Sequence, residues 1–497
     1  MSTNQDESTL AALGYKQELD RRLSRFSNFA VSFSIISILT GGVNSVAQVV
    51  SGVGGAGIGL GWPLGCLLSG LFAIGIAQIS SSFPTAGGLY HWATILGNRF
   101  IGWVTAWINL LGLVTVTTSI NVGTWNFIVG AFGDVLPIPS SPVVTIVAVA
   151  LITFSQAVIN AKGIQLTSRL IDFSGYLLLV MTVIIAGLLL MMSGDLPWSR
   201  LFEFSNRTGP KGGDVWPSVS TSWAFMLGLL LPIYTLTGYD GSAHTSEETK
   251  NAAIAVPKAI ISSVFWAFLG GWLLLIAIVL AIPNMDTAAL QGWNVFFWTL
   301  KQRLPDGLRF PILGTIMLTQ WLCGLATVTS ASRMTFAFAR DGGLPKSKLL
   351  ATVNPTSKAP EMAIWATALA TTTFMAVATL TNIGGVSVYS VIVSCAVIFL
   401  FLAYAIPIIL GGLALGTEKW KTPGEWSIGI IPFRLVSVMV FVSLLTICYI
   451  GIQPPNQWAL MVLMVTITLL IALWFFYQRK HYQGPQAINV GGRDTSK

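Results

Sequence analysis

Charged side chains are scarce in this chain. Asp, Glu, Lys and Arg make up 9% of the 497 residues, whereas soluble domains carry about 25%. None of these four residue types occurs in 26–98 or in 362–417, and each interval is long enough for two membrane spans with a tight connection. A soluble protein with so few charges could not cover its surface, so we predict an all-α membrane protein.

Cysteine and the common catalytic motifs are scarce as well. All four cysteines fall in apolar runs, which indicates small buried hydrophobic side chains rather than disulfides or a CxxC metal site. They are Cys66, Cys323, Cys395 and Cys448. The sequence has no HExxH, no Gly-x-Ser-x-Gly and no Walker loop, so we expect neither an enzyme nor an ATP-driven pump. No metal or other cofactor is predicted.

The sequence also lacks a TVGYG-like selectivity filter and an arginine-rich sensor helix, which disfavours a channel. The net charge of +8 invites a nucleic-acid reading, but positive loop residues are expected of any membrane protein. We therefore expect a lipid bilayer, and no nucleic acid, as the partner. The N-terminus is polar through Arg25 and lacks the basic-then-apolar pattern of a signal peptide.

What the chain has in abundance is apolar length. A helix needs roughly 20 apolar residues to cross a bilayer, and by that rule we predict twelve spans. They are placed at 29–53, 58–81, 101–131, 142–160, 173–193, 222–245, 257–283, 310–336, 361–381, 385–411, 431–452 and 457–477.

The distribution of positive charge predicts the orientation of these spans. With the N-terminus inside, most of the 27 Lys and Arg residues fall in inner segments. The outer segments hold only Arg200, Arg207, Lys211, Lys301, Arg303 and Arg309. Because positive residues are retained on the cytoplasmic side, both termini are predicted to be cytoplasmic, in a plasma or inner cell membrane.

Two spans carry glycine clusters within their apolar runs. Span one contains "ILTGGVNSV" and span six contains "TLTGYDGSA". Mid-helix glycines weaken a helix and let its backbone open, although single glycines also serve close helix packing. Span six begins five helices after span one, so two five-helix units would be inverted relative to each other. Paired interruptions in two such halves predict a binding site between them.

Four stretches resemble a known family. They are "FSNFAVSFSIISILTGG", "QISSSFPTAGGLYHWATIL", "TGYDGSAHTSEETKNAAIAVPKAI" and "SASRMTFAFARDGGLP". Together they resemble the amino acid/polyamine/organocation permeases, closest to the amino acid/choline branch that includes GABA permeases. The similarity covers roughly residues 10–480. Two departures bear on the substrate: Gln78 stands where many relatives have an acid, and "VNSVAQVVSGVGG" differs from GABA-type members.

The resemblance implies a LeuT-like fold of five plus five inverted helices, with helices 1 and 6 discontinuous. It also implies alternating access, with substrate held between the two broken helices. The expected divisions follow the chain. They are a cytoplasmic N-tail at 1–25, a first repeat at 26–193, an extracellular loop at 194–221, a second repeat at 222–411, helices 11 and 12 at 412–478, and a cytoplasmic C-tail at 479–497.

Asp240 is the most informative candidate residue. A charge at bilayer depth costs at least roughly 2.5 kcal/mol, although the apolar run before Asp240 could cross alone and leave the acid at the cytoplasmic edge. By resemblance, Asp240 matches a permease position where an acid gates or contacts substrate. The opposite pole would be the half-helix that follows the first break, whose free N–H groups suit a carboxylate.

The predicted substrate-binding residues are Thr40, Gly41, Gly42, Tyr234, Gly238, Tyr239, Asp240 and Gly241. For a choline-like substrate, Tyr234, Tyr239 and Trp223 could supply aromatic faces to the cation, although aromatics in spans more often pack or form interfacial belts.

The coupling ion is expected to be H+. Asp240, His244 and Glu247 share one face if the second half-helix is regular, which suits a proton relay. The alternative is that "HTSEETKN" is a solvated helix end. Thr327 and Ser330 could instead complete a sodium site.

Two further groups of polar residues need a role. Arg333, Arg340 and Asp341 match the family's Arg-Asp-Gly signature and are expected to form an inner gate or a loop anchor. Asn109 and Asn121 could line the cavity or bond a neighbouring helix.

The predicted function is a secondary active transporter of amino acids or related small amines such as GABA. The alternatives are a choline- or polyamine-type organocation transporter, an amino acid exchanger, and, from another class, a channel or receptor.

Overall fold

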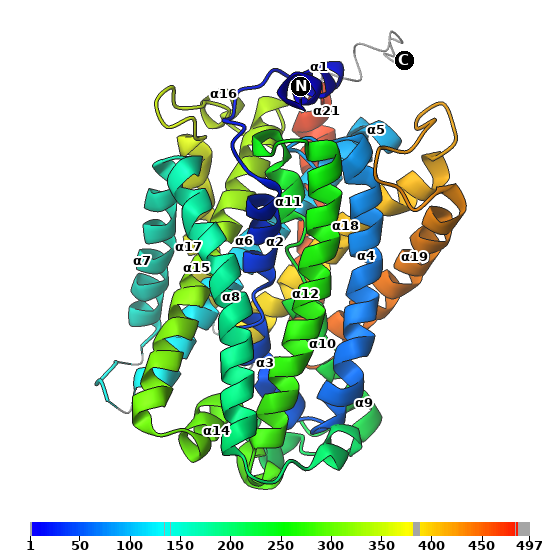
Figure 1. Cartoon of the computed structure of the whole chain (residues 1–497). Coiled ribbons are helices and arrows are strands. Elements are labelled where there is room, and N and C mark those ends of the chain that lie inside the picture. Colours follow the sequence, from blue (N-terminus) through cyan, green and yellow to red (C-terminus); the bar gives the residue numbers. More distant parts are fainter. Residues whose placement is uncertain (1, 134, 140, 381–387, 483, 486–497) are drawn as a thin grey trace.

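The computed structural model describes residues 2–133, 135–139, 141–380, 388–482 and 484–485. The regular secondary structure of these residues is helical, and their only β-type pairings are isolated bridges such as Leu23 with Thr249. The helices form an upright bundle (Figure 1). The fold is therefore the all-α class that the apolar length predicts.

Eleven helices in the described residues are long and apolar enough to cross a membrane. One is the run Arg25–Val50, which contains an interruption described below. The others are α4 (Trp62–Ser82, preceded by η1, Gly57–Gly61), α6 (Arg99–Phe132), α7 (Pro142–Ala161), α8 (Ile164–Met192), α12 (Ala252–Ala281), α15 (Asp306–Arg340), α17 (Glu361–Leu380), α18 (Val388–Ala414), α19 (Ile430–Ile452) and α20 (Gln457–Leu473), which continues as η6 (Trp474–Gln478) and α21 (Arg479–His481).

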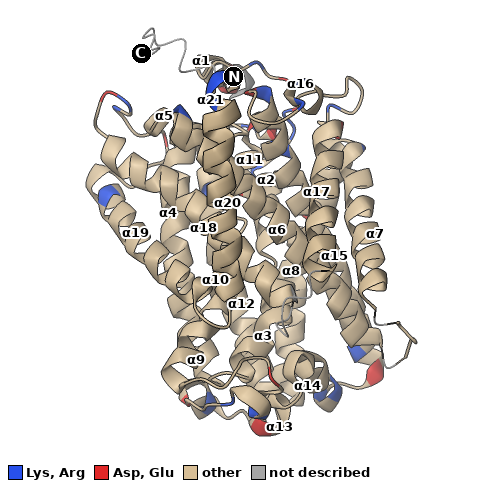
Figure 2. Ribbon diagram, turned by 180° about the vertical axis from the view of Figure 1, so that it is seen from behind, with Lys and Arg blue, Asp and Glu red and all other residues tan. Residues whose placement is uncertain are grey.

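The remaining elements cluster at the two ends of the bundle. The end called here the α1 end carries α1 (Ser2–Ala12), α5 (Leu89–Leu96), α16 (Ser347–Leu350) and α21 (Figure 1). The opposite end, the α14 end, carries α9 (Thr221–Gly228), α13 (Met285–Ala289) and α14 (Val295–Arg303) (Figure 2). Short helical turns complete the connections, namely η2 (Trp198–Phe202), η3 (Gly209–Gly212), η4 (Ser246–Glu248) and η5 (Gly292–Asn294). Lys and Arg lie mainly at the two ends (Figure 2).

Two of the predicted spans begin later in the chain than the corresponding helices. The fifth and seventh spans were predicted to begin at 173 and 257, whereas α8 begins at Ile164 and α12 begins at Ala252. Helix α8 extends beyond its apolar stretch through a first section that contains Arg169 and Asp172, which a rule based on hydropathy does not include. Helix α12 gains the uncharged residues 252–256 ahead of Pro257, a residue that a helix tolerates in its first turns. Residues 381 and 385–387 of the ninth and tenth predicted spans lie outside the described residues.

The first and sixth predicted spans are interrupted. Helix α2 (Arg25–Ile36) ends before Ser37, whose φ is 25°, and α3 (Gly41–Val50) begins four residues later. In the sixth span, α9 and α10 (Leu230–Thr235) are followed by non-helical residues 236–240 and then by the short α11 (Gly241–His244). This interruption explains why the sixth predicted span is not among the eleven long helices.

The second half of span six is not the regular helix that the sequence analysis assumed. Helix α11 has only four residues, and η4 continues the chain as a tighter turn. The segment is also not a solvated helix end, because residues 241–249 are all buried. It runs beneath the N-terminal segment, with which it shares backbone hydrogen bonds at Leu23.

Two glycines allow the sixth span to approach α2 closely. Gly238 has a φ of +89°, and a Cβ there would lie 2.1 Å from Cγ2 of Ile35. A Cβ on Gly241 would lie 2.6 Å from Cδ1 of the same side chain. Real Cβ atoms do not approach so closely, and a positive φ also disfavours any residue with a side chain. These glycines therefore have both of the roles considered in the sequence analysis: they allow an open backbone and they allow close helix packing.

Replacing Gly238 with Ala should destabilise the fold by on the order of 1–3 kcal/mol, because it combines backbone strain with overpacking. Thermal unfolding in detergent measures the effect. Gly187→Ala is the matched control, because a Cβ at that helical position meets nothing within 4 Å, so it should be neutral or slightly stabilising. Equal midpoints for the two variants would contradict this account of Gly238.

Candidate functional site

The two interruptions lie against each other inside the bundle. A Cβ on Gly41, the first residue of α3, would lie 2.9 Å from Oγ1 of Thr235, the last residue of α10. On the other side of the breaks, the Ser32 hydroxyl donates to the carbonyl of Tyr239 at 2.7 Å. The Ser242 hydroxyl in turn donates to the carbonyl of Asn28 at 2.9 Å. Helix α2 and the residues around α11 are thus joined through hydroxyl groups and backbone.

Asp240 lies in the second break and is fully buried. Its Oδ1 accepts a hydrogen bond of 2.7 Å from the Tyr404 hydroxyl of α18, and its Oδ2 lies 3.2 Å from Nε2 of His244. The same Tyr404 oxygen accepts a bond from the Gly238 N–H at 3.2 Å. Asp240 is therefore not at the water-exposed edge that the apolar run left open.

The backbone of Ala86 connects Asp240 and His244 to a second acid, Glu247. Nδ1 of His244 lies 3.0 Å from the Ala86 carbonyl oxygen, and the Ala86 N–H donates to Oε1 of Glu247 at 3.0 Å. Ala86 belongs to the "PTAGG" stretch of the permease resemblance. The structure places Asp240, His244 and Glu247 near one another, but Glu247 is reached through the backbone of Ala86 and not along the helix face on which the sequence analysis depended.

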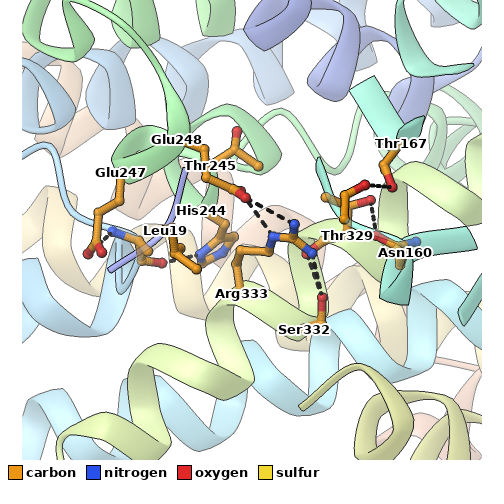
Figure 3. A network of polar contacts seen from close by, with 12 residues as sticks. Leu19, Asn160, Thr167, His244, Thr245, Glu247, Glu248, Thr329, Ser332 and Arg333 are labelled. Carbon is orange, nitrogen blue, oxygen red and sulfur yellow. Dashed lines mark hydrogen bonds and ion pairs between the residues drawn. The ribbon is translucent and has the colours of Figure 1, made fainter. Parts of the chain in front are cut away.

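Two arginines of α15 hold the acids of η4. Arg333 and Glu248 form a bidentate pair with both N···O distances at 3.0 Å, and both side chains are fully buried. Figure 3 shows Arg333 between Glu248 and the Ser332 hydroxyl. Arg340 forms a second bidentate pair with Glu247, at 3.0 and 2.9 Å. Bidentate arginine pairs are both strong and specific in geometry.

The electrostatics of Glu247 favour its ionised form. Burial alone would raise the pKa of this carboxyl. The charge of Arg340 and the hydrogen bonds from Arg340 and the Ala86 N–H outweigh burial and hold the pKa of Glu247 below its ordinary value. Glu247 is therefore the charged partner of Arg340 in an ion pair at the α1 end. His91 of α5 is no proton carrier at neutral pH, because burial, followed by the charge of Arg340, lowers its pKa to about 3.

Asp341 joins the N-terminal segment to α5. Its carboxylate accepts hydrogen bonds from the Tyr15 hydroxyl at 2.9 and 3.0 Å and from the Tyr90 hydroxyl at 2.8 Å. The guanidinium of Arg340 lies 4.0 Å from the centre of the Tyr15 ring, within the range of a cation–π contact. Burial raises the pKa of Asp341 to about 6, against the opposing effects of Arg340 and the two tyrosine hydroxyls.

The N-terminal segment also contacts the residues that follow η4, and the sequence analysis did not predict these contacts. Arg21 donates to the carbonyl of Thr249 at 2.7 Å. Asp6 accepts from the N–H groups of Asn251 and Ala252 at 2.7 and 3.1 Å, so a residue of α1 caps the start of α12. The local sequence does not predict these contacts, because the partners are more than 200 residues apart.

The residues predicted as the carboxylate pole lie at the start of α3. Thr40 precedes the helix without capping it, and its hydroxyl bonds that of Ser37 at 2.7 Å. Backbone hydrogen bonds in the described residues include one from Gly41 to Ser37 but none from the N–H of Gly42 to the break. A Cβ on Gly42 would contact Leu275 of α12 at 3.8 Å, so its open side faces that helix.

The predicted aromatic residues do not act together. The Tyr234 hydroxyl bonds Ser119 of α6 at 2.8 Å, and the Tyr239 ring packs on Tyr404 with centroids 5.0 Å apart. Trp223 has a different partner: its indole N–H donates to the carbonyl of Pro454 at 3.3 Å. The structure places Trp223 in α9, at the α14 end of the bundle, away from the two tyrosines that were considered with it for a choline-like cation.

The structure gives different surroundings to the polar residues whose roles the sequence analysis left undecided. Asn121 bonds the neighbouring helix α7 through Gln156, whereas both amide atoms of Asn109 are buried without a partner among the described residues. The Thr327 hydroxyl donates to the backbone at Cys323, and the Ser330 hydroxyl is buried without a partner in the same part of the chain. No group of three or more His, Cys, Asp or Glu side chains among the described residues could hold a metal ion.

A cavity of about 560 Å³ opens near the α14 end. Its walls come from α3, α6, η5, α14, α15 and α18. The residues that line it include Val43, Asn44, Gly123, Phe127, Trp293 and Tyr389. None of the predicted substrate contacts is among its lining residues within the described chain, although Val43 and Asn44 directly follow Gly42.

Eleven candidate spans among the described residues, with a buried acid and two facing helix breaks in the interior, define a multi-pass membrane protein. The amino acid permease family model matches residues 23–474, and the chain belongs to this family, whose members are transporters and not enzymes. The resemblance noted in the sequence is thereby confirmed.

Three relatives illustrate the similarity. The chain is 32% identical to "Amino-acid permease BAT1" of Arabidopsis thaliana, over 96% of this chain and 95% of the relative. It is 34% identical to the "Amino-acid permease BAT1 homolog" of Oryza sativa subsp. japonica, over 84% and 82%. It is 27% identical to the "GABA-specific permease" of Saccharomyces cerevisiae, over 99% and 87%.

Breaking the Arg340 pair should be costly. Arg340→Gln leaves the buried Glu247 carboxylate without its counter-charge, which typically costs about 3–5 kcal/mol. The double variant with Glu247→Gln should recover part of that loss, because no unpaired charge remains. Thermal unfolding checks both variants. Lys421→Gln is the control, because its pair with Glu418 is exposed and should contribute little. A double variant no more stable than Arg340→Gln would argue against the pair.

Asp341 should make stability depend on pH. Its folded pKa of about 6 exceeds the ordinary 3.8, so its contribution is greatest below pH 4 and decreases as the pH rises to about 6, by on the order of 2–3 kcal/mol. Unfolding midpoints between pH 5 and 7 test the upper part of this window, where Glu247 stays ionised. Asp341→Asn should remove this slope, and a slope identical to the wild type would exclude the assignment.

Proposed function

We propose that the chain is a secondary active transporter of amino acids or related small amines such as GABA, working by alternating access with H+ as the coupling ion. The observation that carries the proposal is the meeting of two interrupted helices beside the buried carboxylate of Asp240, in a member of a permease family. Backbone opened at membrane depth is tolerated only where protein or a cavity satisfies it.

The architecture in this proposal has twelve spans, the broken sixth included, in a LeuT-like arrangement of inverted repeats at 26–193 and 222–411. Support comes from the breaks themselves, which fall at the first span of each repeat. Helices 11 and 12 are α19 and α20. The α1 end is proposed as the cytoplasmic side, because it carries the N-terminal segment and the majority of the Lys and Arg residues.

Access in the present conformation is proposed to be from outside. The ion pairs of Arg333 and Arg340, with Asp341, act as the inner gate and close the α1 end. The cavity at the α14 end supplies an outer entrance that leads toward α3. Inward opening would then require the arginine pairs to separate, so the gate is a two-state element that substrate and proton can bias.

Substrate would bind between the breaks. The N–H of Gly42 suits a carboxylate, because the start of a helix carries a partial positive charge. The N–H groups of Thr40 and Gly41 donate to the Ser37 carbonyl in this conformation, so they would have to leave it to join the site. Gly238, Tyr239, Asp240 and Gly241 would contribute the opposite pole, with Tyr234 beside them. The Asp240 carboxylate already exchanges contacts with Tyr404 and His244, so gain or loss of a proton there would change what it can bind. Names of relatives support amino acids or GABA over organocations such as choline.

Uptake into proteoliposomes of the purified chain tests the function. A labelled panel of GABA, neutral amino acids, choline and a polyamine is offered under an imposed pH gradient, under a sodium gradient, and with an uncoupler. Accumulation of an amino acid or GABA that the uncoupler abolishes is expected. Accumulation that follows sodium and ignores the pH gradient would overturn proton coupling, and conductance without saturation would favour a channel.

Asp240→Asn should abolish gradient-driven accumulation while the protein still reaches the membrane and unfolds cooperatively, because the amide keeps the shape but cannot carry the proton or charge. Asp286→Asn is the matched control, an exposed acid paired with Arg207 at the α14 end, and it should transport normally. Normal accumulation by Asp240→Asn would refute the role of this carboxylate.

A further inference from the structure

A pair of amide side chains links the cavity to the first helix break. Nδ2 of Asn44 donates to Oε1 of Gln320 at 3.3 Å, and Nε2 of Gln320 donates back to Oδ1 of Asn44 at 3.3 Å. The same Nε2 also donates to the carbonyl of Leu39, at 3.3 Å, within the non-helical residues between α2 and α3. Gln320 of α15 is fully buried, whereas Asn44 is half-buried and lines the cavity.

The chain contains a second amide pair that serves as a reference. Asn121 and Gln156 also exchange two hydrogen bonds, of 2.9 and 3.0 Å, and both are fully buried. These distances fall at the usual value for N–H···O bonds, whereas 3.3 Å lies at the long end. The pair beside the cavity is therefore the looser of the two, and its exposed member is open to an additional partner.

The Asn44 amide can lie at the cavity wall because residue 123 is a glycine. A Cβ at Gly123 of α6 would lie 2.7 Å from Nδ2 of Asn44 and 3.4 Å from the ring of Tyr389. The neighbouring cavity walls are aromatic, from Phe127, Trp293 and Tyr389. Asn44 thus presents an amide at the deep, α3 side of a cavity whose nearby walls are largely aromatic.

We propose that Asn44, held by Gln320, determines specificity by selecting substrates whose side chain can both donate and accept a hydrogen bond, as a hydroxyl or carboxamide does. The inference rests on the proposed function and names the substrate class for that site. An amide has two N–H donors and an oxygen with two lone pairs. The pair with Gln320 uses one of each, which leaves Asn44 one donor and one acceptor for the substrate.

An aliphatic substrate of the same shape is disfavoured by this arrangement. It would cover the remaining donor and acceptor of Asn44 without replacing the water bound to them. Sites that place polar groups against a substrate discriminate most strongly against analogues that lack the matching group. One hydrogen bond of ordinary net strength corresponds to about tenfold in affinity.

Threonine and valine form the test pair, because they differ by one hydroxyl in place of a methyl group. Competition uptake in proteoliposomes gives the ratio of apparent affinities for the two amino acids. We expect the wild type to favour threonine by about tenfold. Asn44→Leu, which keeps the shape of the side chain, should reduce the ratio to near one while valine uptake is retained.

Two further variants separate selectivity from folding. Gly123→Ala should displace the Asn44 amide and also lower the ratio, without removing any polar group. Asn121→Leu disrupts the reference pair and should lower the unfolding midpoint but leave the threonine-to-valine ratio at the wild-type value.

The outcomes distinguish this inference from the proposed function. Transport of amino acids with an unchanged ratio in folded Asn44→Leu and Gly123→Ala would overturn the inference and leave the function standing. A wild type with no preference for threonine would overturn it as well. Failure of the wild type to accumulate any member of the wider amino acid and amine panel would instead overturn the proposed function, and the inference with it.

Discussion

The structure depends on one constraint: backbone groups opened inside a membrane need partners, because lipid offers none. The two breaks meet this requirement largely with side chains from other helices. The carbonyl of Leu39 accepts from Gln320, and the carbonyl of Ile35 accepts a weak bond from the Cys323 thiol. In the second break, Tyr404 and Ser32 perform the same task for Gly238 and Tyr239. The polar residues of the interior are therefore the condition for an unwound site to exist.

The ion pairs at the α1 end have a different physical character. Buried ion pairs contribute little net stability, because removing two charges from water offsets their attraction. Their value is geometric: Arg333 and Arg340 each have one bidentate partner in η4. A closure made of such pairs is firm while both partners are present and yields when the geometry changes. An apolar plug of equal area would have no comparable dependence on charge and proton binding.

Much of the fold could be read from the sequence, because hydropathy reports apolar length and glycine clusters report weak helix. The long apolar helices and the interruption near Gly41 follow from such local signals, whereas the pattern alone left open whether Asp240 is buried or lies at the membrane edge. The partners of these residues could not be predicted. Tyr404 lies 164 residues from Asp240, and no periodicity relates the two. The surroundings of Trp223 could not be predicted either, because composition records that an aromatic residue is present and not where its side chain points.

The docking of α1 has a consequence for biosynthesis. Asp6 bonds the backbone 245 residues later, and Tyr15 bonds Asp341, 326 residues later. The ribosome therefore releases the first segment of the chain long before either partner has been made. That segment must wait, unpaired, until the helix ending at Arg340 has been inserted. The part of the chain that is made first is thus among the last to reach its native position.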